Sequence, residues 1–188
     1  HPLPHIESIK MLADKGLDGI ELICEYPDDI LYFMQPHNFS TLLSLKDDYG
    51  LQYYIHAPWG DTNAASLNEG IRRATVDDWK RSIDFAHRLG SRLVTVHIGH
   101  RSTLESREAV IARAIKSVEE VALVAQEAEI WLSVENTGQG PSQLFSNAND
   151  LVDIWSRIEM PFVGMTFDIG HAFLQRLDIC DCLVKMAK

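Results

Sequence analysis

The strongest constraint on the fold is a regular alternation of short β-type runs and helical stretches along a chain of 188 residues. Each run carries a polar side chain at or near its end, beginning with Glu21, and successive ones lie about 33 to 41 residues apart. One strand–helix unit of a barrel takes roughly 30 residues, so the spacing fits such units. Strict alternation predicts a parallel sheet, which is either doubly wound or closed. The runs cover residues 19–23, 52–56, 93–97, 131–135 and 163–168.

Two features favour a closed barrel over a doubly wound sheet. Residues two apart in a strand share a face, so Tyr54 lies on the face of His56 while Tyr53 and Ile55 lie on the other. The other runs repeat this division into an apolar face, suited to lie under helices, and a mixed face with every candidate ligand. In a barrel the mixed face points inward. The glycine-rich phosphate turn that usually follows the first strand of a doubly wound sheet is also missing from the sequence.

The helical stretches are predicted from apolar spacing and from capping signals. The clearest pattern places apolar residues on one face of residues 110–125. Another helix is predicted to begin at Thr75, which forms a capping-box-like pair with Asp78, and to end at Gly90. Shorter helices are expected over residues 6–15, 39–49 and 149–157. Every run except the last is therefore expected to be followed by a helix.

The predicted fold class is α/β, a (β/α)₈ TIM barrel that is incomplete in this chain. A full barrel has eight strands and typically ~250 residues, whereas about five to six strand–helix units are recognisable here. Residues 1–188 are interpreted as a single domain. We expect one further strand before residue 1 and at least two after residue 188, because five parallel strands alone would leave exposed edges with unpaired backbone groups.

Composition narrows the classes of function. A formal net charge of −10 argues against non-specific attachment to nucleic acid or to an anionic membrane. No stretch approaches the ~20 apolar residues that cross a bilayer, so no membrane partner is expected. Three cysteines cannot all pair within one chain, which favours a reducing, cytoplasmic location. Cys180 and Cys182 are interpreted as ordinary helix residues, since no further thiol or histidine lies nearby to complete a metal site.

Four side chains at the ends of successive runs form the candidate metal site: His56, His97, Glu135 and Asp168. The active face of a barrel is the C-terminal end of its strands, so these groups are expected to converge. A divalent metal requires imidazole and carboxylate ligands aimed at one point from rigid elements. A single strand-end histidine or aspartate is more often a capping residue, but four at equivalent positions favour metal binding. His171 completes an Asp-x-x-His pair with Asp168 and adds a fifth group.

Four segments resemble the signature segments of the xylose isomerase-like TIM barrels. They are residues 56–59 (HAPW), 97–100 (HIGH), 135–140 (ENTGQG) and 167–173 (FDIGHAF). That superfamily contains the endonuclease IV type of abasic-site nuclease and many sugar and sugar-phosphate isomerases and epimerases. The resemblance runs from about Ile6 to Phe173, nearly the whole chain.

The resemblance implies two different ligand sets. In endonuclease IV proteins, the matching residues are all zinc ligands: His56, His97, Glu135, Asp168 and His171. In the isomerases, the glutamate and aspartate hold one metal, the histidine of Asp-x-x-His lies near substrate oxygens, and a further histidine and glutamate come from strands seven and eight. Segment 135–140 lacks the nuclease alanine before Gly-Gln-Gly, and segment 97–100 is one residue tighter than the nuclease version.

The leading prediction is a metal-dependent sugar or sugar-phosphate isomerase or epimerase. Segment 16–22 (GLDGIEL) is similar to the isomerases' second strand, whose glutamate faces the substrate, and the loop of residues 58–68 also looks like theirs. Glu135 is expected to ligate a divalent metal (Mn, Zn, Mg or Co) and to act as acid and base on a carbon-bound proton. The metal would polarise the neighbouring carbonyl. Substrate contacts are expected from Glu21, Trp59, His100 and His171.

Two alternatives stay open, and an oligomer is compatible with all readings. An endonuclease IV-like zinc phosphodiesterase would act on abasic DNA, which is a partner only in this case, and Trp59 would wedge into the duplex rather than wall a sugar pocket. Such a nuclease needs a basic surface around the site, and Arg72, Arg73 and Arg101 are few residues for contacts with phosphate groups. A barrel that binds a small ligand without turnover would keep the pocket but lack a complete ligand set. Trp59 has a third reading, as a simple exposed loop residue with no part in a site.

Overall fold

The computed structural model describes residues 5–26, 28–102, 104–138, 144 and 148–186. Residues 139 and 140 of the predicted segment 135–140 therefore lie outside the described residues. The strands are β1 Gly19–Ile23, β2 Gln52–His56, β3 Leu93–Val96, β4 Trp131–Glu135 and β5 Val163–Thr166. The helices are α1 His5–Asp14, α2 Asp29–Phe33, α3 Pro36–Tyr49, α4 Glu69–Leu89, α5 Arg107–Glu127, α6 Ala148–Trp155, α7 Ile169–Leu174 and α8 Ile179–Met186.

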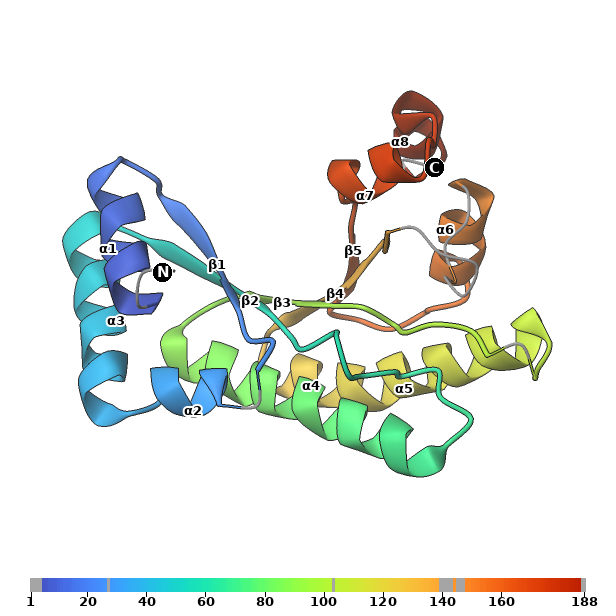
Figure 1. The fold of residues 1–188 in the computed structure, drawn as a ribbon, viewed down its shortest axis with the longest axis horizontal. Helices are drawn as coiled ribbons and strands as arrows, with labels where there is room; N and C mark the ends of the chain where they lie inside the picture. The colour runs from blue at the N-terminus through green and yellow to red at the C-terminus, as the bar shows by residue number, and fades with distance from the viewer. Residues whose placement is uncertain (1–4, 27, 103, 139–143, 145–147, 187–188) are drawn as a thin grey trace.

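The five strands form one parallel sheet in the order β1-β2-β3-β4-β5. All four neighbouring pairs are parallel, which confirms the predicted α/β fold with its parallel sheet. The strands cross the middle of the molecule in Figure 1, with α1 and α3 beside the β1 end and α6, α7 and α8 beside the β5 end. Because the strands run in one direction, all their C-terminal ends lie at the same edge of the sheet.

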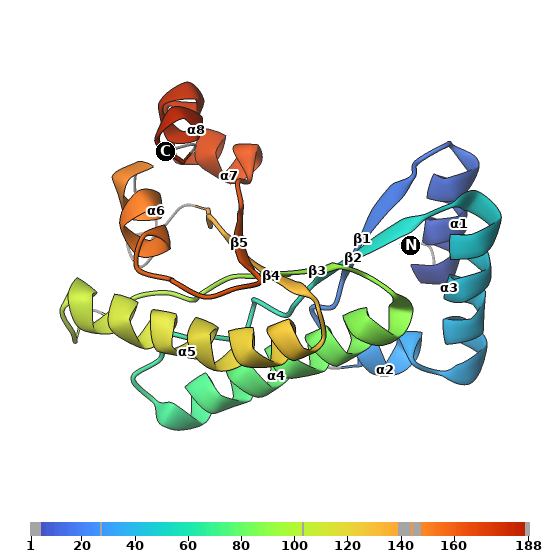
Figure 2. The same cartoon turned by 180° about the vertical axis from the view of Figure 1, so that it is seen from behind.

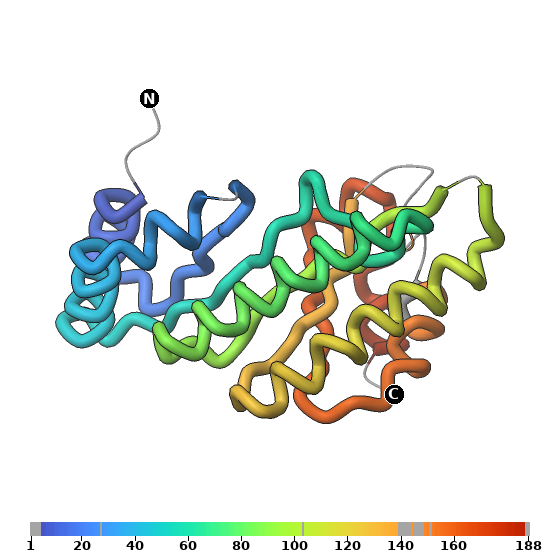
Figure 3. The backbone as a smooth tube through the Cα atoms, turned by 90° about the horizontal axis from the view of Figure 1, so that it is seen from below, coloured from blue at the N-terminus to red at the C-terminus, as the bar shows by residue number. Residues whose placement is uncertain are grey.

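One face of the sheet is buried under helices. Helices α4 and α5 pack against each other and cover β2, β3 and β4, as Figures 2 and 3 show from two further directions. Seven sheet residues on this face are at most 4% exposed: Tyr53, Ile55, Val94, Val96, Leu132, Val134 and Val163. They are members of the apolar alternation predicted from the sequence, and their burial makes this layer the hydrophobic core.

The opposite face of the sheet carries the mixed set of side chains. Tyr54 on β2 is 39% exposed and Trp131 on β4 is 48% exposed. Hydroxyl groups also pair across this face, since Ser133 Oγ lies 2.6 Å from Thr166 Oγ1. The division into a covered apolar face and a polar face thus follows the period of two in the sequence.

Helix α4 begins six residues before the predicted start at Thr75, so that prediction was wrong. Asn68 is the actual N-cap, and its side chain accepts a hydrogen bond from the Gly70 N–H at 2.9 Å. Thr75 lies inside the helix and is 1% exposed. Its hydroxyl donates to the Ile71 carbonyl and accepts from the Asn63 N–H, so this polar residue is satisfied within the packed helix.

Two helices follow the last strand in the described part of the chain, and the sequence predicted only the one that contains Cys180 and Cys182. β5 ends at Thr166, and α7 begins at Ile169 with Asp168 as its N-cap, followed by α8. A six-residue helix offers too little periodicity to be seen in the sequence. Cys180 and Cys182 lie in α8 as predicted, and all three cysteines are free.

Among the described residues, no helix is long and apolar enough to span a membrane.

Candidate metal centre and adjoining pocket

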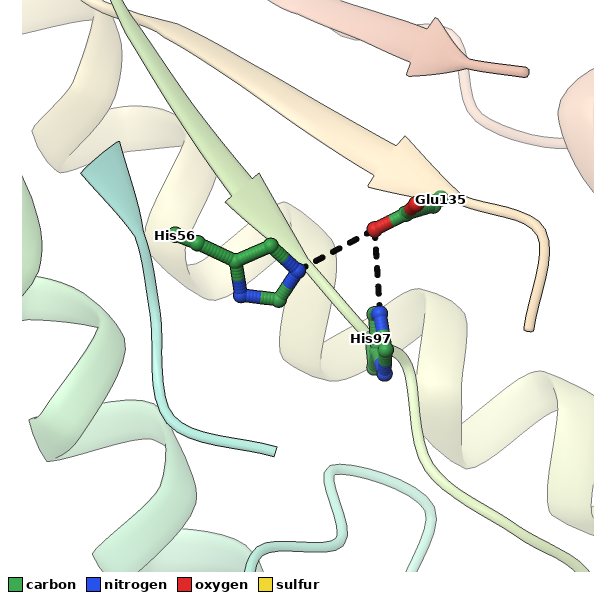
Figure 4. Close-up of side chains that lie close together, drawn as sticks. All are labelled: His56, His97 and Glu135. Carbon is green, nitrogen blue, oxygen red and sulfur yellow. Dashed lines mark hydrogen bonds and ion pairs between the residues drawn. The ribbon is translucent and has the colours of Figure 1, made fainter. Parts of the chain in front are cut away.

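Three side chains from neighbouring strands converge at the C-terminal edge of the sheet. Glu135 ends β4, His56 ends β2, and His97 follows the last residue of β3. The Nε2 atoms of His56 and His97 lie 3.1 and 3.0 Å from the same Glu135 oxygen, Oε2 (Figure 4). Glu135 is 5% exposed and His56 is 8% exposed. Parallel pairing of β2, β3 and β4 brings these positions together, as the strand-end pattern predicts.

The tautomer of His56 is set by its backbone. Its Nδ1 lies 2.8 Å from the Ala57 carbonyl oxygen and donates to it, because a carbonyl can only accept. In a neutral ring, Nε2 then carries a lone pair that faces the Glu135 carboxylate. Two such acceptors repel unless a cation lies between them, either a proton on the ring or a metal ion. Histidines that bind a divalent metal are commonly arranged in this way, with one ring nitrogen facing the metal and the other donating to a carbonyl.

Electrostatics at the cluster favour the charged form of Glu135. Burial raises the pKa of this carboxyl, but hydrogen bonds from His56 and His97 outweigh burial and lower the pKa to about 2. Burial lowers the pKa of His56, whereas the hydrogen bond to Glu135 raises it, and the net pKa of His56 is raised. Glu135 is therefore a buried anion that is stabilised by two flanking imidazoles.

A second group of candidate ligands shares Glu135. Ligand atoms of Glu135, Asp168 and His171 lie within 4.8 Å of one another, as do those of His56, His97 and Glu135. His171 Nδ1 is 3.8 Å from Glu135 Oε1 and 3.9 Å from Asp168 Oδ1. The five side chains predicted as metal ligands are thus gathered around one carboxylate.

The position of Asp168 differs from the predicted strand end. It lies two residues beyond β5, and its Oδ1 accepts a hydrogen bond from the His171 N–H at the start of α7. The side chain is 36% exposed, so an oxygen remains accessible. Capping a helix and binding a metal were treated as alternatives in the sequence analysis, but Asp168 both caps α7 and lies near Glu135.

A polar pocket of about 310 Å³ adjoins the cluster. Trp59 stands over the histidines, with its ring centroid 4.8 Å from that of His56 and 5.7 Å from that of His97. Three of the four residues predicted to contact substrate line this pocket: Trp59, His100 and His171. The fourth, Glu21, lies on the same face of the sheet but apart from the pocket. It accepts a hydrogen bond from Thr95 Oγ1 at 2.9 Å and lines a separate, largely apolar hollow along β1.

Glu25 holds the loop that carries Trp59, and sequence reasoning missed it. Its two carboxylate oxygens accept hydrogen bonds from the backbone N–H groups of Trp59 and Gly60, at 2.8 and 2.6 Å. A Cβ atom at Gly60 would lie 2.2 Å from the nearer oxygen, so the close approach needs glycine. The partners are 34 and 35 residues apart in sequence and match no short motif, so no local signal pointed to this clamp.

Two of the arginines considered for phosphate contact are engaged elsewhere. Arg72 is 4% exposed and pairs with Glu69 and Glu120 at 2.8 and 3.2 Å. Arg73 pairs with Glu69 at 3.2 Å. Among the described residues that line the pocket, none is lysine or arginine. The pocket therefore offers histidine, tryptophan and backbone groups rather than fixed positive charge.

A sequence profile of the xylose isomerase-like TIM barrels matches residues 9–186, almost all of the chain. The chain belongs to this family. An uncharacterized protein of Methanocaldococcus jannaschii is 30% identical over 167 residues, which cover 88% of this chain and 56% of that protein. The chain thus spans just over half the length of this curated relative.

Two solved structures superimpose well on this chain. A D-tagatose 3-epimerase-like protein matches with a TM-score of 0.85 and 28% identity, covering 96% of this chain and 67% of that one. An AP endonuclease family 2 protein from Brucella melitensis matches with a TM-score of 0.77 and 21% identity, covering 98% and 70%. Both carry the TIM-barrel fold of the family, so the five-stranded sheet is part of that architecture.

Proposed function

We propose that this chain is part of a metal-dependent sugar or sugar-phosphate isomerase or epimerase that moves a proton next to a carbonyl group. The observation that carries the proposal is the placement of Glu135. Its buried, ionised carboxylate is shared by two groups of candidate ligands and lies beside a polar pocket. The pocket volume of about 310 Å³ is near the lower end of the ~300–1,000 Å³ of small-molecule sites.

The residues present fit a divalent metal. His56, His97, Glu135, Asp168 and His171 offer imidazole nitrogens and carboxylate oxygens, the donors that suit Mn, Zn or Co, while Mg favours the carboxylates. The anchored Nδ1 of His56 leaves Nε2 as the donor atom. A bound metal would polarise a substrate carbonyl and stabilise the charge that develops when a proton leaves the neighbouring carbon.

The chain's own residues supply the rest of the proposed chemistry. Glu135 would hold the metal through one carboxylate oxygen and exchange a carbon-bound proton at the other, since its Oε2 faces His56 and His97 and its Oε1 faces His171. Trp59 forms an apolar wall, held in place by Glu25, against which a sugar ring or chain can lie. His100 and His171 offer ring nitrogens to hydroxyl oxygens across the pocket.

The charges of the chain favour a sugar over a nucleic acid as the substrate. The net charge of −10 and the engagement of Arg72 and Arg73 with glutamates leave little positive charge for a phosphate backbone. The likeness to a D-tagatose 3-epimerase-like protein at 28% identity supports a ketose as substrate. The curated relative is longer than this chain, so the substrate is proposed here for the whole protein.

One observation favours the alternative, an endonuclease IV-like zinc phosphodiesterase acting on abasic DNA. Two ligand groups that share a carboxylate are suited to two metal ions, which phosphodiesterases use to hold the attacking and leaving oxygens. Trp59 would then face the DNA. The structural likeness to an AP endonuclease family 2 protein is compatible with this alternative, although at 21% identity it concerns the fold alone.

The two functions are separated by one pair of assays on the full-length protein. The protein is incubated with Mn²⁺, Co²⁺, Zn²⁺ or Mg²⁺ and a panel of ketoses in D₂O, and proton NMR follows exchange at carbons next to the carbonyl. The same preparations are mixed with a duplex that contains an abasic site. We expect metal-dependent exchange that EDTA abolishes, and intact DNA. Strand cleavage without any ketose exchange would overturn the proposal in favour of the nuclease.

A further inference from the structure

Asn136, the residue after Glu135, holds Asp168 through both ends of its side-chain amide. Asn136 is 1% exposed and lies just beyond β4. Its Oδ1 accepts a hydrogen bond from the Asp168 N–H at 2.6 Å, and its Nδ2 donates to the Asp168 carbonyl oxygen at 2.9 Å. The amide therefore fixes the backbone of Asp168 at two points.

The backbone of Asn136 contacts the other member of the Asp-x-x-His pair. His171 Nδ1 lies 2.8 Å from the Asn136 carbonyl oxygen and donates to it, which leaves Nε2 as the nitrogen of His171 that could bind a metal. The Asn136 N–H in turn donates to the Thr166 carbonyl at 3.4 Å, which continues the pairing of β4 with β5 by one step. A single buried residue thus touches Asp168, His171 and the end of β5.

An amide side chain suits both backbone groups of Asp168. β5 ends at Thr166, so the Asp168 N–H has left the regular ladder and needs a new partner, whereas the Asp168 carbonyl also accepts from the Ala172 N–H at 3.1 Å. Asparagine presents one acceptor and one donor at fixed spacing, which matches the two backbone groups. Aspartate lacks the donor, and alanine lacks both groups. The Asp168 carboxylate accepts the His171 N–H at the start of α7 and has no donor, so it does not replace the amide.

We propose that Asn136 is a positioning residue whose side chain holds Asp168 against Glu135, so that the second ligand group forms only when this clamp is intact. The inference rests on the proposed metal centre. Residues that orient metal ligands typically change metal affinity by about 10- to 100-fold when they are removed. Because Asn136 acts through Asp168, its effect should vanish when Asp168 itself is absent.

The test is a Co²⁺ titration of the full-length protein, followed by visible absorption, for the wild type, Asn136→Ala, Asn136→Asp and Asp168→Ala. We expect Asn136→Ala to weaken Co²⁺ binding about 10- to 100-fold. Asn136→Asp keeps the acceptor but sets a carboxylate oxygen against the Asp168 carbonyl, so it should also weaken Co²⁺ binding, and it remains informative if the alanine variant misfolds. Adding Asn136→Ala to Asp168→Ala should cause no further loss.

Ser133→Ala is the matched control. It removes a side-chain hydrogen bond between the same two strands, Ser133 Oγ to Thr166 Oγ1 at 2.6 Å, without touching Asp168. Its Co²⁺ binding should equal that of the wild type. A second readout needs no metal: the Asp168 amide should be protected from hydrogen exchange in the wild-type and Ser133→Ala proteins and exchange faster in Asn136→Ala.

The outcomes separate this inference from the proposed function. Unchanged Co²⁺ binding in Asn136→Ala, with the Asp168 amide still protected, would overturn the clamp while leaving the metal centre standing. An equal loss in Ser133→Ala would also overturn it, since any weakening of the β4–β5 edge would then suffice. Failure of the wild-type protein to bind Co²⁺ would overturn the proposed metal centre and this inference with it.

Discussion

Replacing Glu135 by glutamine is expected to abolish metal-dependent activity while the fold is retained. Glutamine has nearly the same shape and can still hydrogen-bond to the Nε2 atoms that now lie 3.0 and 3.1 Å from the carboxylate. It removes the negative charge that both ligand groups share, and it cannot accept a proton from carbon. Loss of a general acid–base group alone costs about 10²–10⁴-fold in rate, and loss of metal adds to this.

The measurement is turnover together with metal content after dialysis, on full-length wild-type and Glu135→Gln proteins with matching circular dichroism spectra. Glu119→Gln is the control, because it makes the same chemical change at a residue that is exposed on the outer helix α5, away from the site. Glu119→Gln should keep both properties. Normal turnover or normal metal content in Glu135→Gln would show that Glu135 is a structural residue.

Replacing Trp79 by alanine is expected to destabilise the fold by about 3–5 kcal/mol, the usual cost of truncating a fully buried tryptophan. Trp79 lies in α4, is 0% exposed and is among the largest fully buried side chains. Helix α4 covers β2 and β3, the strands whose ends carry His56 and His97. Within the described residues, the Trp79 Nε1–H has no hydrogen-bond partner, so the loss is one of apolar packing.

Urea denaturation of the metal-free full-length protein measures this change in the free energy of unfolding. Trp79→Phe should cost much less than Trp79→Ala, because it keeps an aromatic ring and removes the unpaired donor. Leu123→Ala, at a position 56% exposed on α5, should stay within about 0.5 kcal/mol of the wild type. A loss below about 1 kcal/mol in Trp79→Ala would mean that α4 is not packed on the sheet in this way.

The parallel sheet could be predicted because two repeating patterns can be read directly from the sequence: the alternation of side chains within a strand and the alternation of strands with helices. Alternation within each strand separates Tyr53 and Ile55, which are buried under helices, from Tyr54 and His56 on the other face. The repeat of strand and helix then brings the strand ends to one edge. Glu135 and His97 could be placed together on this basis alone, since a parallel ladder joins β3 to β4.

The clamps around the site could not be predicted, because they join residues that are far apart in sequence. Glu25 reaches the Trp59 loop across 34 residues, and Asn136 reaches Asp168 across 32. Neither partner pair has a fixed spacing that sequence reasoning could use. Glu21 is not among the residues that line the pocket, because facing the right side of a strand does not determine how far along the edge a side chain reaches.

The position of a bound metal tests the central claim most directly. Crystals of the full-length protein with Mn²⁺, measured at a wavelength where manganese scatters anomalously, would locate the ion without reference to activity. We predict an anomalous peak about 2.0–2.2 Å from a Glu135 carboxylate oxygen, with at least one further ligand from His56, His97, Asp168 or His171. A fully occupied manganese site that does not touch Glu135, or no site at saturating Mn²⁺, would contradict the account.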